Sequence, residues 1–115
     1  MRSRFQAVVD GKLTGYLSAI SEAELWRRVK PSEIERHEAM LSYFISLSLD
    51  SSAARLAGEW MQKYEAQGLG WMDALIVATA QKAGLLILTR DAKLARVLAD
   101  EARFEVYAVT RTGTF

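Results

Sequence analysis

Residues 72–91 read MDALIVATAQKAGLLILTRD and contain the clearest structural signals of the chain. Residues 72–83 are apolar nearly all round, which predicts a buried helix that ends before Gly84. Residues 85–89 form a continuous apolar run, as is typical of strands inside parallel sheets. Asp91 then opens another predicted helix, which ends near residue 99. This alternation indicates an α/β sandwich with a mostly parallel sheet.

The same alternation extends through the rest of the chain. Strands are predicted over residues 13–20, 43–49 and 104–109, and a long helix is predicted after a cap at residues 50–52, with Gly68 just past its end. Ser21 with Glu24, and Ser32 with Glu35, have the spacing of capping boxes at the starts of two further helices. Residues 4–9 are either a helix or a short strand, and we favour the helix because a preceding parallel strand would need a longer crossover.

The composition describes one ordinary globular domain spanning residues 1–115. The chain has 15 Lys and Arg against 14 Asp and Glu, one histidine and no cysteine. Disulfides, thiolate nucleophiles, cysteine-containing zinc sites and multi-histidine metal sites are therefore excluded. The near-zero net charge gives no general case for a polyanion partner. We find no secretory signal and no apolar run long enough to span a bilayer, and we expect a cytoplasmic protein.

Three acidic residues lie close to predicted junctions between strands and helices. Glu24 is one turn into the helix after residues 13–20, Asp73 is in the first turn of the buried helix, and Asp91 lies just past residues 85–89. Ligands of parallel α/β sheets bind where strands are followed by helices, so these carboxylates are expected to converge if the strands are neighbours. Clustered carboxylates repel one another unless a cation such as Mg²⁺ or Mn²⁺ lies between them or their pKa values are raised.

Each acid also has a purely structural interpretation. Glu24 can complete the capping box of Ser21, and Asp91 can serve as the N-cap of the helix that follows it. Asp73 gains from the positive end of its helix, but a charge close to a buried surface favours a functional role. For Glu24 and Asp91 both interpretations stay open.

Other candidate residues carry weaker signals. Arg27, Arg90 and Lys93 are candidate contacts for RNA phosphates, although such residues are more often a solvated face. Trp60 is expected in the core, together with Ile34, Met40 and Leu41, whereas Trp71 precedes Asp73 in a glycine loop and is a candidate for substrate or partner contact. His37 is expected to be an exposed surface residue.

Three segments together carry a family resemblance: residues 19–25 (AISEAEL), residues 73–80 (DALIVATA) and residues 88–91 (LTRD). In this order and at these separations they resemble the PIN-domain ribonucleases, specifically the VapC-type toxins of prokaryotic toxin–antitoxin pairs. The resemblance runs from about residue 11 to residue 109, and the segment beginning at Asp73 is its most specific part.

The resemblance implies a three-layer α/β/α sandwich and endoribonuclease activity that depends on Mg²⁺ or Mn²⁺. It implies that Glu24, Asp73 and Asp91 are the second, third and fourth acids of the family's quartet and hold the metal. Asp73 would be its direct ligand, and Glu24 and Asp91 would orient bound water or the ion. Thr89 would be the hydroxyl residue beside the site, and Ser21 a supporting residue. It also implies a homodimer, with an apolar surface near residues 43–49, and an antitoxin whose peptide lies in the acidic groove.

The chain departs from the family pattern at its N-terminus. Members begin with a central strand that ends in the first acid, followed by a helical crossover, and no counterpart precedes residues 13–20. Asp10 is too close to Glu24 to replace that acid. We therefore expect a domain that is N-terminally truncated relative to the family. Our first hypothesis is a metal-dependent ribonuclease toxin, and the alternative is a catalytically impaired PIN-like remnant that acts as a protein-binding or dimerisation module.

Overall fold

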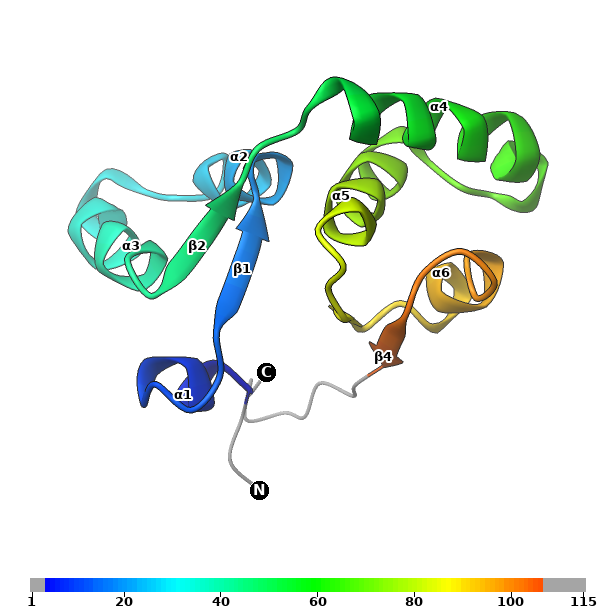
Figure 1. Ribbon diagram of the computed structural model, residues 1–115. Coiled ribbons are helices and arrows are strands. Elements are labelled where there is room, and N and C mark those ends of the chain that lie inside the picture. Colours follow the sequence, from blue (N-terminus) through cyan, green and yellow to red (C-terminus); the bar gives the residue numbers. More distant parts are fainter. Residues whose placement is uncertain (1–3, 107–115) are drawn as a thin grey trace.

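The computed structural model describes residues 4–106, in which helices and strands alternate (Figure 1). The helices are α1 (Arg4–Val9), α2 (Ala19–Trp26), α3 (Ile34–Leu41), α4 (Ser51–Tyr64), α5 (Trp71–Lys82) and α6 (Ala92–Val97). The strands are β1 (Gly15–Ser18), β2 (Phe44–Leu47), β3 (Ile87–Thr89) and β4 (Phe104–Val106), and short 3₁₀ helices span Pro31–Glu33 and Glu65–Gln67. The predicted α/β class is confirmed, and residues 107–109 of the last predicted strand lie outside the described residues.

The strand pairs are parallel, as predicted, but they belong to two separate sheets of two strands each, β1 with β2 and β3 with β4. The registers run from Gly15 opposite Phe44 to Ser18 opposite Leu47 in the first sheet, and from Ile87 opposite Phe104 to Thr89 opposite Val106 in the second. Residues 4–106 thus contain two separate parallel pairs, because no strand in that range is hydrogen-bonded between β1 and β3, and this fits the expected lack of the family's central strand. In Figure 1, β1 and β2 lie on the left and β4 on the lower right.

Two predicted N-caps are confirmed. The carboxylate of Asp50 accepts a hydrogen bond from the backbone N–H of Ala53 at 2.9 Å, and the carboxylate of Asp91 accepts one from the backbone N–H of Leu94 at 3.0 Å. Each satisfies a backbone donor that has no partner within its helix and places negative charge at the positive end of that helix. Gly84 follows the end of α5 with φ +71°, a left-handed conformation that stops the helix where the sequence predicts.

The predicted capping box at Ser21 is wrong. Strand β1 ends at Ser18, so α2 begins at Ala19, and the Ser18 hydroxyl is the cap that accepts from the backbone N–H of Ser21 at 3.0 Å. The Ser18 hydroxyl also donates to the Ser21 hydroxyl at 3.0 Å. Glu24 therefore lies farther along the helix, where it has no capping role with Ser21.

The predicted cap at Ser32 is also wrong. Pro31 opens a 3₁₀ turn before α3, and the carboxylate of Glu33 accepts from the backbone N–H of Lys30 at 3.0 Å. Helix α3 itself begins at Ile34, past Ser32. Proline favours this early start because its fixed φ is already helical and it needs no partner for an N–H.

The hydrophobic core lies in the C-terminal half of the described chain. Its buried members are Ala53, Ala57, Trp60, Met61, Tyr64, Leu69, Ala74, Val77, Ala78, Ile87 and Leu98. Trp60 is in the core as predicted, whereas Ile34 is 42% exposed, because α3 packs on no comparable apolar layer, and Met40 and Leu41 are only partly buried. An exposed ion pair from Arg4 to Glu105, with a shortest N–O distance of 2.6 Å, links α1 to β4.

The described part of the chain contains no membrane-spanning helix, since every helix there is too short or too polar.

The predicted N-terminal helix at residues 4–9 is confirmed as α1, and it packs on the first sheet. Phe5 of α1 stacks on Phe44 of β2 with ring centroids 6.0 Å apart. Gly15 of β1 faces this contact, and a Cβ at Gly15 would lie 2.8 Å from the Phe44 ring and 3.0 Å from a methyl carbon of Val8. Glycine is therefore required by close packing at this position rather than by its backbone angles.

We expect Gly15→Ala to destabilise the fold by about 1–3 kcal/mol, because the added methyl group forces the Phe44 ring out of its place. Thermal denaturation measures the effect. Gly70→Ala is the matched control, since a Cβ at Gly70 meets no atom within 4 Å. Equal melting temperatures for Gly15→Ala and the wild type would contradict the packing shown here.

Glu101 joins α4 to the segment before β4. One carboxylate oxygen, Oε2, accepts hydrogen bonds from the hydroxyl of Tyr64 at 2.6 Å and from the ammonium group of Lys63 at 3.1 Å. The hydrogen bond from Tyr64, followed by that from Lys63, lowers the pKa of Glu101 below its ordinary value of 4.5. The charged carboxylate therefore stabilises the folded state.

We expect Glu101→Gln to lower the melting temperature at about pH 7. Because the folded-state pKa lies below the unfolded value of 4.5, the stabilisation is complete above pH 4.5 and is lost as the pH falls through the folded-state pKa. The difference between wild type and variant should therefore shrink below pH 4.5 in a series of thermal melts. Glu59→Gln, which removes an equal charge from an exposed side chain of α4, should show no such dependence.

Candidate active site

The three candidate acids come from three separate elements. Glu24 lies on α2, Asp73 in the first turn of α5, and Asp91 at the N-cap of α6, two residues after β3 ends. The strand-to-helix junctions after β1 and β3 thus supply Glu24 and Asp91, as the sequence predicts. Helix α5, which lies between the two sheets in sequence, supplies Asp73.

The carboxyl group of Asp73 is the electrostatic centre of this group. Its pKa is raised from the ordinary value of 3.8, mainly because burial disfavours the charged form and further because of the negative charges of Asp91 and Glu24. The residue as a whole is still exposed, so the loss of hydration concerns the carboxyl group itself. The negative charges of Asp91 and Glu24 therefore act on the Asp73 carboxylate across the space between the three elements.

The arrangement does not by itself form a metal site. Among residues 4–106, no three Asp, Glu or His side chains are placed to hold one ion together. The three acids therefore interact without reaching the separations that a shared cation requires. The split sheet explains this, because Glu24 follows β1 and Asp91 follows β3, and these strands are not paired with each other.

Thr89 and Asp91 form a local turn that also serves the structure. The Thr89 hydroxyl accepts from the backbone N–H of Asp91 at 3.0 Å, while Oδ1 of Asp91 caps α6. The structural interpretation of Asp91 as an N-cap is therefore correct, and the cap holds the carboxylate near Asp73. Ser21, on α2, hydrogen-bonds Ser18 at the end of β1 and donates no hydrogen bond to the three acids within residues 4–106.

The basic candidates occupy different positions around these acids. Arg27 is the exposed C-cap of α2, and Arg90 is exposed directly before Asp91. Lys93 extends its side chain over the loop after α4, where a Cβ on Gly68 would lie 2.8 Å from its Nζ. Arg27 and Arg90 thus lie close to Glu24 and Asp91 in sequence, and the Lys93 side chain lies beside Gly68.

The prediction that His37 is an exposed surface residue is wrong. Its ring meets the ring of Trp26 edge to face, with centroids 4.4 Å apart, and its Nε2 atom is buried with no hydrogen-bond partner within residues 4–106. Helices α2 and α3 follow each other closely, so the aromatic contact covers the imidazole.

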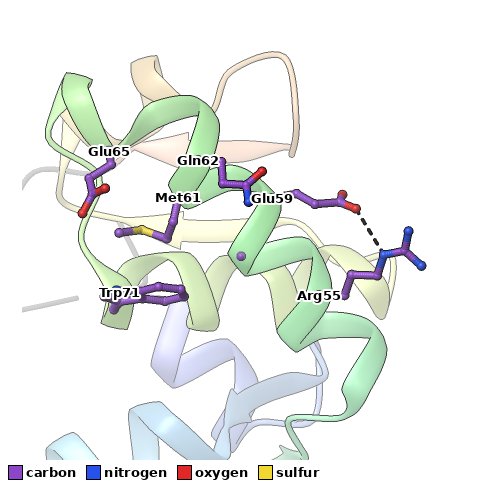
Figure 2. A pocket seen from close by; sticks show the side chains of 7 residues that line it. Arg55, Glu59, Met61, Gln62, Glu65 and Trp71 are labelled. Carbon is purple, nitrogen blue, oxygen red and sulfur yellow. Dashed lines mark hydrogen bonds and ion pairs between the residues drawn. The ribbon is translucent and has the colours of Figure 1, made fainter.

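Sequence reasoning missed a hollow of about 460 Å³ beside α4, which Figure 2 shows from close by. Its lining residues are Arg55, Gly58, Glu59, Met61, Gln62, Glu65 and Trp71. Trp71, a predicted contact residue, is 55% exposed at its edge. The available signal was the spacing of Arg55, Gly58, Gln62 and Glu65, which places them on one face of a helix.

A comparison with models of protein families identifies the family of this chain. The PIN domain model matches residues 2–99. The chain belongs to the PIN-domain family. Members of this family are nucleases and typically depend on metal ions, and the resemblance of residues 19–25, 73–80 and 88–91 to that family is confirmed.

Three solved structures, one of them a member of the VapBC family of toxin–antitoxin systems, share the fold of this PIN domain. FitAcB from Neisseria gonorrhoeae is 28% identical with a TM-score of 0.69, the match covering 87% of this chain and 82% of that one. VapBC-1 from nontypeable Haemophilus influenzae is 18% identical with a TM-score of 0.72 and coverages of 90% and 84%. VapBC-5 from Mycobacterium tuberculosis is 21% identical with a TM-score of 0.59 and coverages of 80% and 79%. No curated protein matches the chain by sequence.

Proposed function

We propose that this PIN domain is the toxin of a toxin–antitoxin pair and that it hydrolyses RNA phosphodiester bonds with Mg²⁺ or Mn²⁺. The observation that carries the proposal is the placing of three acids on three separate elements, Glu24 on α2, Asp73 at the start of α5 and Asp91 at the N-cap of α6. Burial chiefly, and the charges of Asp91 and Glu24 in addition, raise the pKa of Asp73. Repulsion of this kind is what a bound divalent cation relieves. Such a cation polarises a phosphoryl oxygen and lowers the pKa of a bound water.

The described acids fit the metal only in part. Three carboxylates within electrostatic range are the right ligand type for a hard cation, but no three of them surround one position within residues 4–106. We propose that a fourth acid completes the set, carried by a strand that pairs with the free edges of β1 and β3. Each of these strands has one hydrogen-bonded neighbour among the described residues, so both have an unpaired edge.

Several features of the surface support RNA as the substrate. Arg27 and Arg90 are exposed close to Glu24 and Asp91 in sequence, where they would neutralise phosphates next to the scissile bond. Lys93 is a candidate contact at greater distance, beside Gly68. Ser21 and Thr89 would act only as supporting residues, through the hydrogen bonds that hold their turns.

The partners of the proposed toxin follow from its relatives. VapBC-5 belongs to the VapBC family of toxin–antitoxin systems, and VapBC-1 carries the same family name, so we propose a cognate antitoxin whose peptide covers the acidic groove. We also propose a cytoplasmic location, where cellular RNA is found. We also propose a homodimer. Tyr43 and Ile45, near the surface that the sequence suggested for it, are 48% and 50% exposed.

A second candidate function rests on a specific observation. Because no three acids form a metal-binding cluster within the described residues, the chain is also suited to be a non-catalytic PIN domain that binds protein partners. The exposed apolar side chains of β2 and of the start of α5 would then be its contact surfaces.

RNA cleavage separates the two functions. A mixed RNA substrate is incubated with the purified chain, with and without Mg²⁺ or Mn²⁺, beside Asp73→Asn. Metal-dependent cleavage that the substitution abolishes supports the ribonuclease. Absence of cleavage by both proteins favours the binding module for this chain. The proposed fourth acid has a separate test in the DNA upstream of the coding sequence. If the strand that carries this acid belongs to the same gene, that DNA should encode, in frame, a short apolar strand ending in Asp.

A further inference from the structure

Trp71 contributes little to the core of the described chain. It opens α5 two residues before Asp73 and is 55% exposed, more than any other large hydrophobic side chain within residues 4–106. By contrast, Trp60 is buried in the core and Trp26 packs against His37. A broad indole ring that stays open to water next to a candidate active site is suited to a flat ligand that covers it.

The Trp71 ring forms one wall of the hollow of about 460 Å³ beside α4. Met61 is buried, and Figure 2 shows its side chain reaching from α4 toward Trp71, so the ring is supported from the side of α4. The volume of the hollow is within the range of small-molecule sites. A planar group the size of a nucleobase can therefore lie against the open part of the indole.

The polar side chains of this hollow offer hydrogen bonds rather than positive charge. Within residues 4–106, Gln62 and Glu65 have no side-chain hydrogen bond or ion pair, whereas Glu59 is paired with Arg55 at 3.3 Å. A carboxylate only accepts hydrogen bonds, while an amide both accepts and donates them. With one arginine against two glutamates, the hollow does not attract a phosphate, but it can bind a base that carries amino hydrogens.

A cation for the backbone of such a nucleotide lies beside the loop that leads to Trp71. The Nζ atom of Lys93 would be 2.8 Å from a Cβ at Gly68, three residues before Trp71. Lys93 belongs to α6, the helix that Asp91 caps. Its ammonium group thus connects the helix that carries one candidate acid with the loop that carries the indole, where it can neutralise a phosphate.

We propose that Trp71 and the hollow beside it form a subsite for one unpaired base of the RNA substrate, and that the subsite prefers bases with an amino group over uracil. The inference rests on the proposed ribonuclease function. Aromatic side chains bind unpaired bases by stacking. The amino group of adenine, cytosine or guanine would donate to the Glu65 carboxylate, whereas uracil presents carbonyl oxygens that the carboxylate repels.

The base in this subsite belongs to a nucleotide beside the cleaved bond rather than at it. Successive residues of an α-helix are about 100° apart around its axis, so Trp71 and Asp73 leave different sides of the first turn of α5. Trp71 lines the hollow beside α4 and Asp73 does not. Trp71 is therefore a specificity-determining residue, and its loss should weaken the binding of RNA without changing the candidate acids.

Fluorescence anisotropy with the full chain in EDTA tests the subsite in the absence of cleavage. The probes are labelled single-stranded oligomers of adenine, cytosine or uracil nucleotides. We expect Trp71→Ala to weaken the binding of the adenine and cytosine oligomers by about tenfold, and Trp71→Phe to weaken it less, because a phenyl ring still stacks. Glu65→Gln should narrow the preference for these oligomers over uracil, since an amide can also donate to a uracil carbonyl.

The salt dependence of binding separates stacking from phosphate contact. Stacking releases no counterions, so Trp71→Ala should leave the slope of log affinity against log salt unchanged. Lys93→Ala should reduce the magnitude of that slope by about one. Leu86→Ala removes an exposed apolar side chain before β3 and should change neither the affinity nor the slope. Circular dichroism shows that each variant is folded.

The outcomes distinguish the subsite from the proposed function. RNA that is bound and cleaved equally well by the wild type and by Trp71→Ala overturns the subsite, leaves the ribonuclease intact, and assigns Trp71 to the protein contacts of the second candidate function. A wild type that binds the uracil oligomer best overturns the base preference. A chain that neither binds nor cleaves any RNA overturns the subsite together with the proposed function.

Discussion

Trp60→Ala is expected to destabilise the folded chain by about 3–5 kcal/mol, a large part of the stability of a domain this size. Trp60 is 3% exposed. It belongs to the buried apolar cluster that joins α4 and α5 to Ile87 and Leu98. The large, almost fully buried indole supplies much of the packing of this cluster, so its removal leaves a cavity. Urea denaturation followed by circular dichroism gives the free energy of unfolding.

Trp71→Ala is the control for this substitution. The same change of residue type there removes a side chain that is 55% exposed, so the stability should change by less than about 1 kcal/mol. A similar loss for both variants would show that the core does not lie where the structure places it. The decisive result is therefore that Trp60→Ala lowers the free energy of unfolding far more than Trp71→Ala does.

Asp73→Asn is expected to change stability and activity in opposite directions. The pKa of Asp73 is raised above 3.8 by burial and by Asp91 and Glu24, so the charged form is less favourable in the folded than in the unfolded chain. The folded state therefore loses stability as the pH rises from about 3.8 through the raised pKa, and the loss remains complete above it. A neutral amide of the same shape removes this penalty, so the melting temperature at about pH 7 should rise.

The same substitution should reduce metal-dependent RNA cleavage to the level without metal. Thermal melts at several pH values check the stability effect, which should vanish below pH 3.8. Asp100→Asn, at an exposed position after α6, removes the same charge and should give neither effect. A destabilised Asp73→Asn protein would mean that the carboxylate serves the fold rather than a site, and would weaken the proposed function.

Signals that depend on a few adjacent residues were predictable. Asp50 and Asp91 cap their helices as expected because the required contact, from a carboxylate to a backbone N–H three residues later, is local. Gly84 ends α5 for the same reason. The start of α2 was not predictable, since Ser18 and Ser21 are equally good caps and only the length of β1 selects Ser18.

Properties that depend on distant residues could be predicted only in part. That Glu24, Asp73 and Asp91 would approach one another was inferred from their places near strand ends, and it stays a prediction, although the charges of Asp91 and Glu24 contribute to the raised pKa of Asp73 after burial. Whether they could share an ion depends on the pairing of β1 and β3, which no local pattern specifies. The burial of His37 against Trp26 likewise depends on how α2 and α3 are oriented.

The sequence by itself determined the α/β class, the family and the two aspartate caps. These follow from hydrophobic periodicity and short-range hydrogen bonding, which act over a few residues. Only the tertiary structure decided that the parallel strands of residues 4–106 form two sheets, and that a hollow lies beside α4. Sheet pairing and surface shape are set by contacts between residues far apart in the chain, and many such arrangements satisfy the same local pattern.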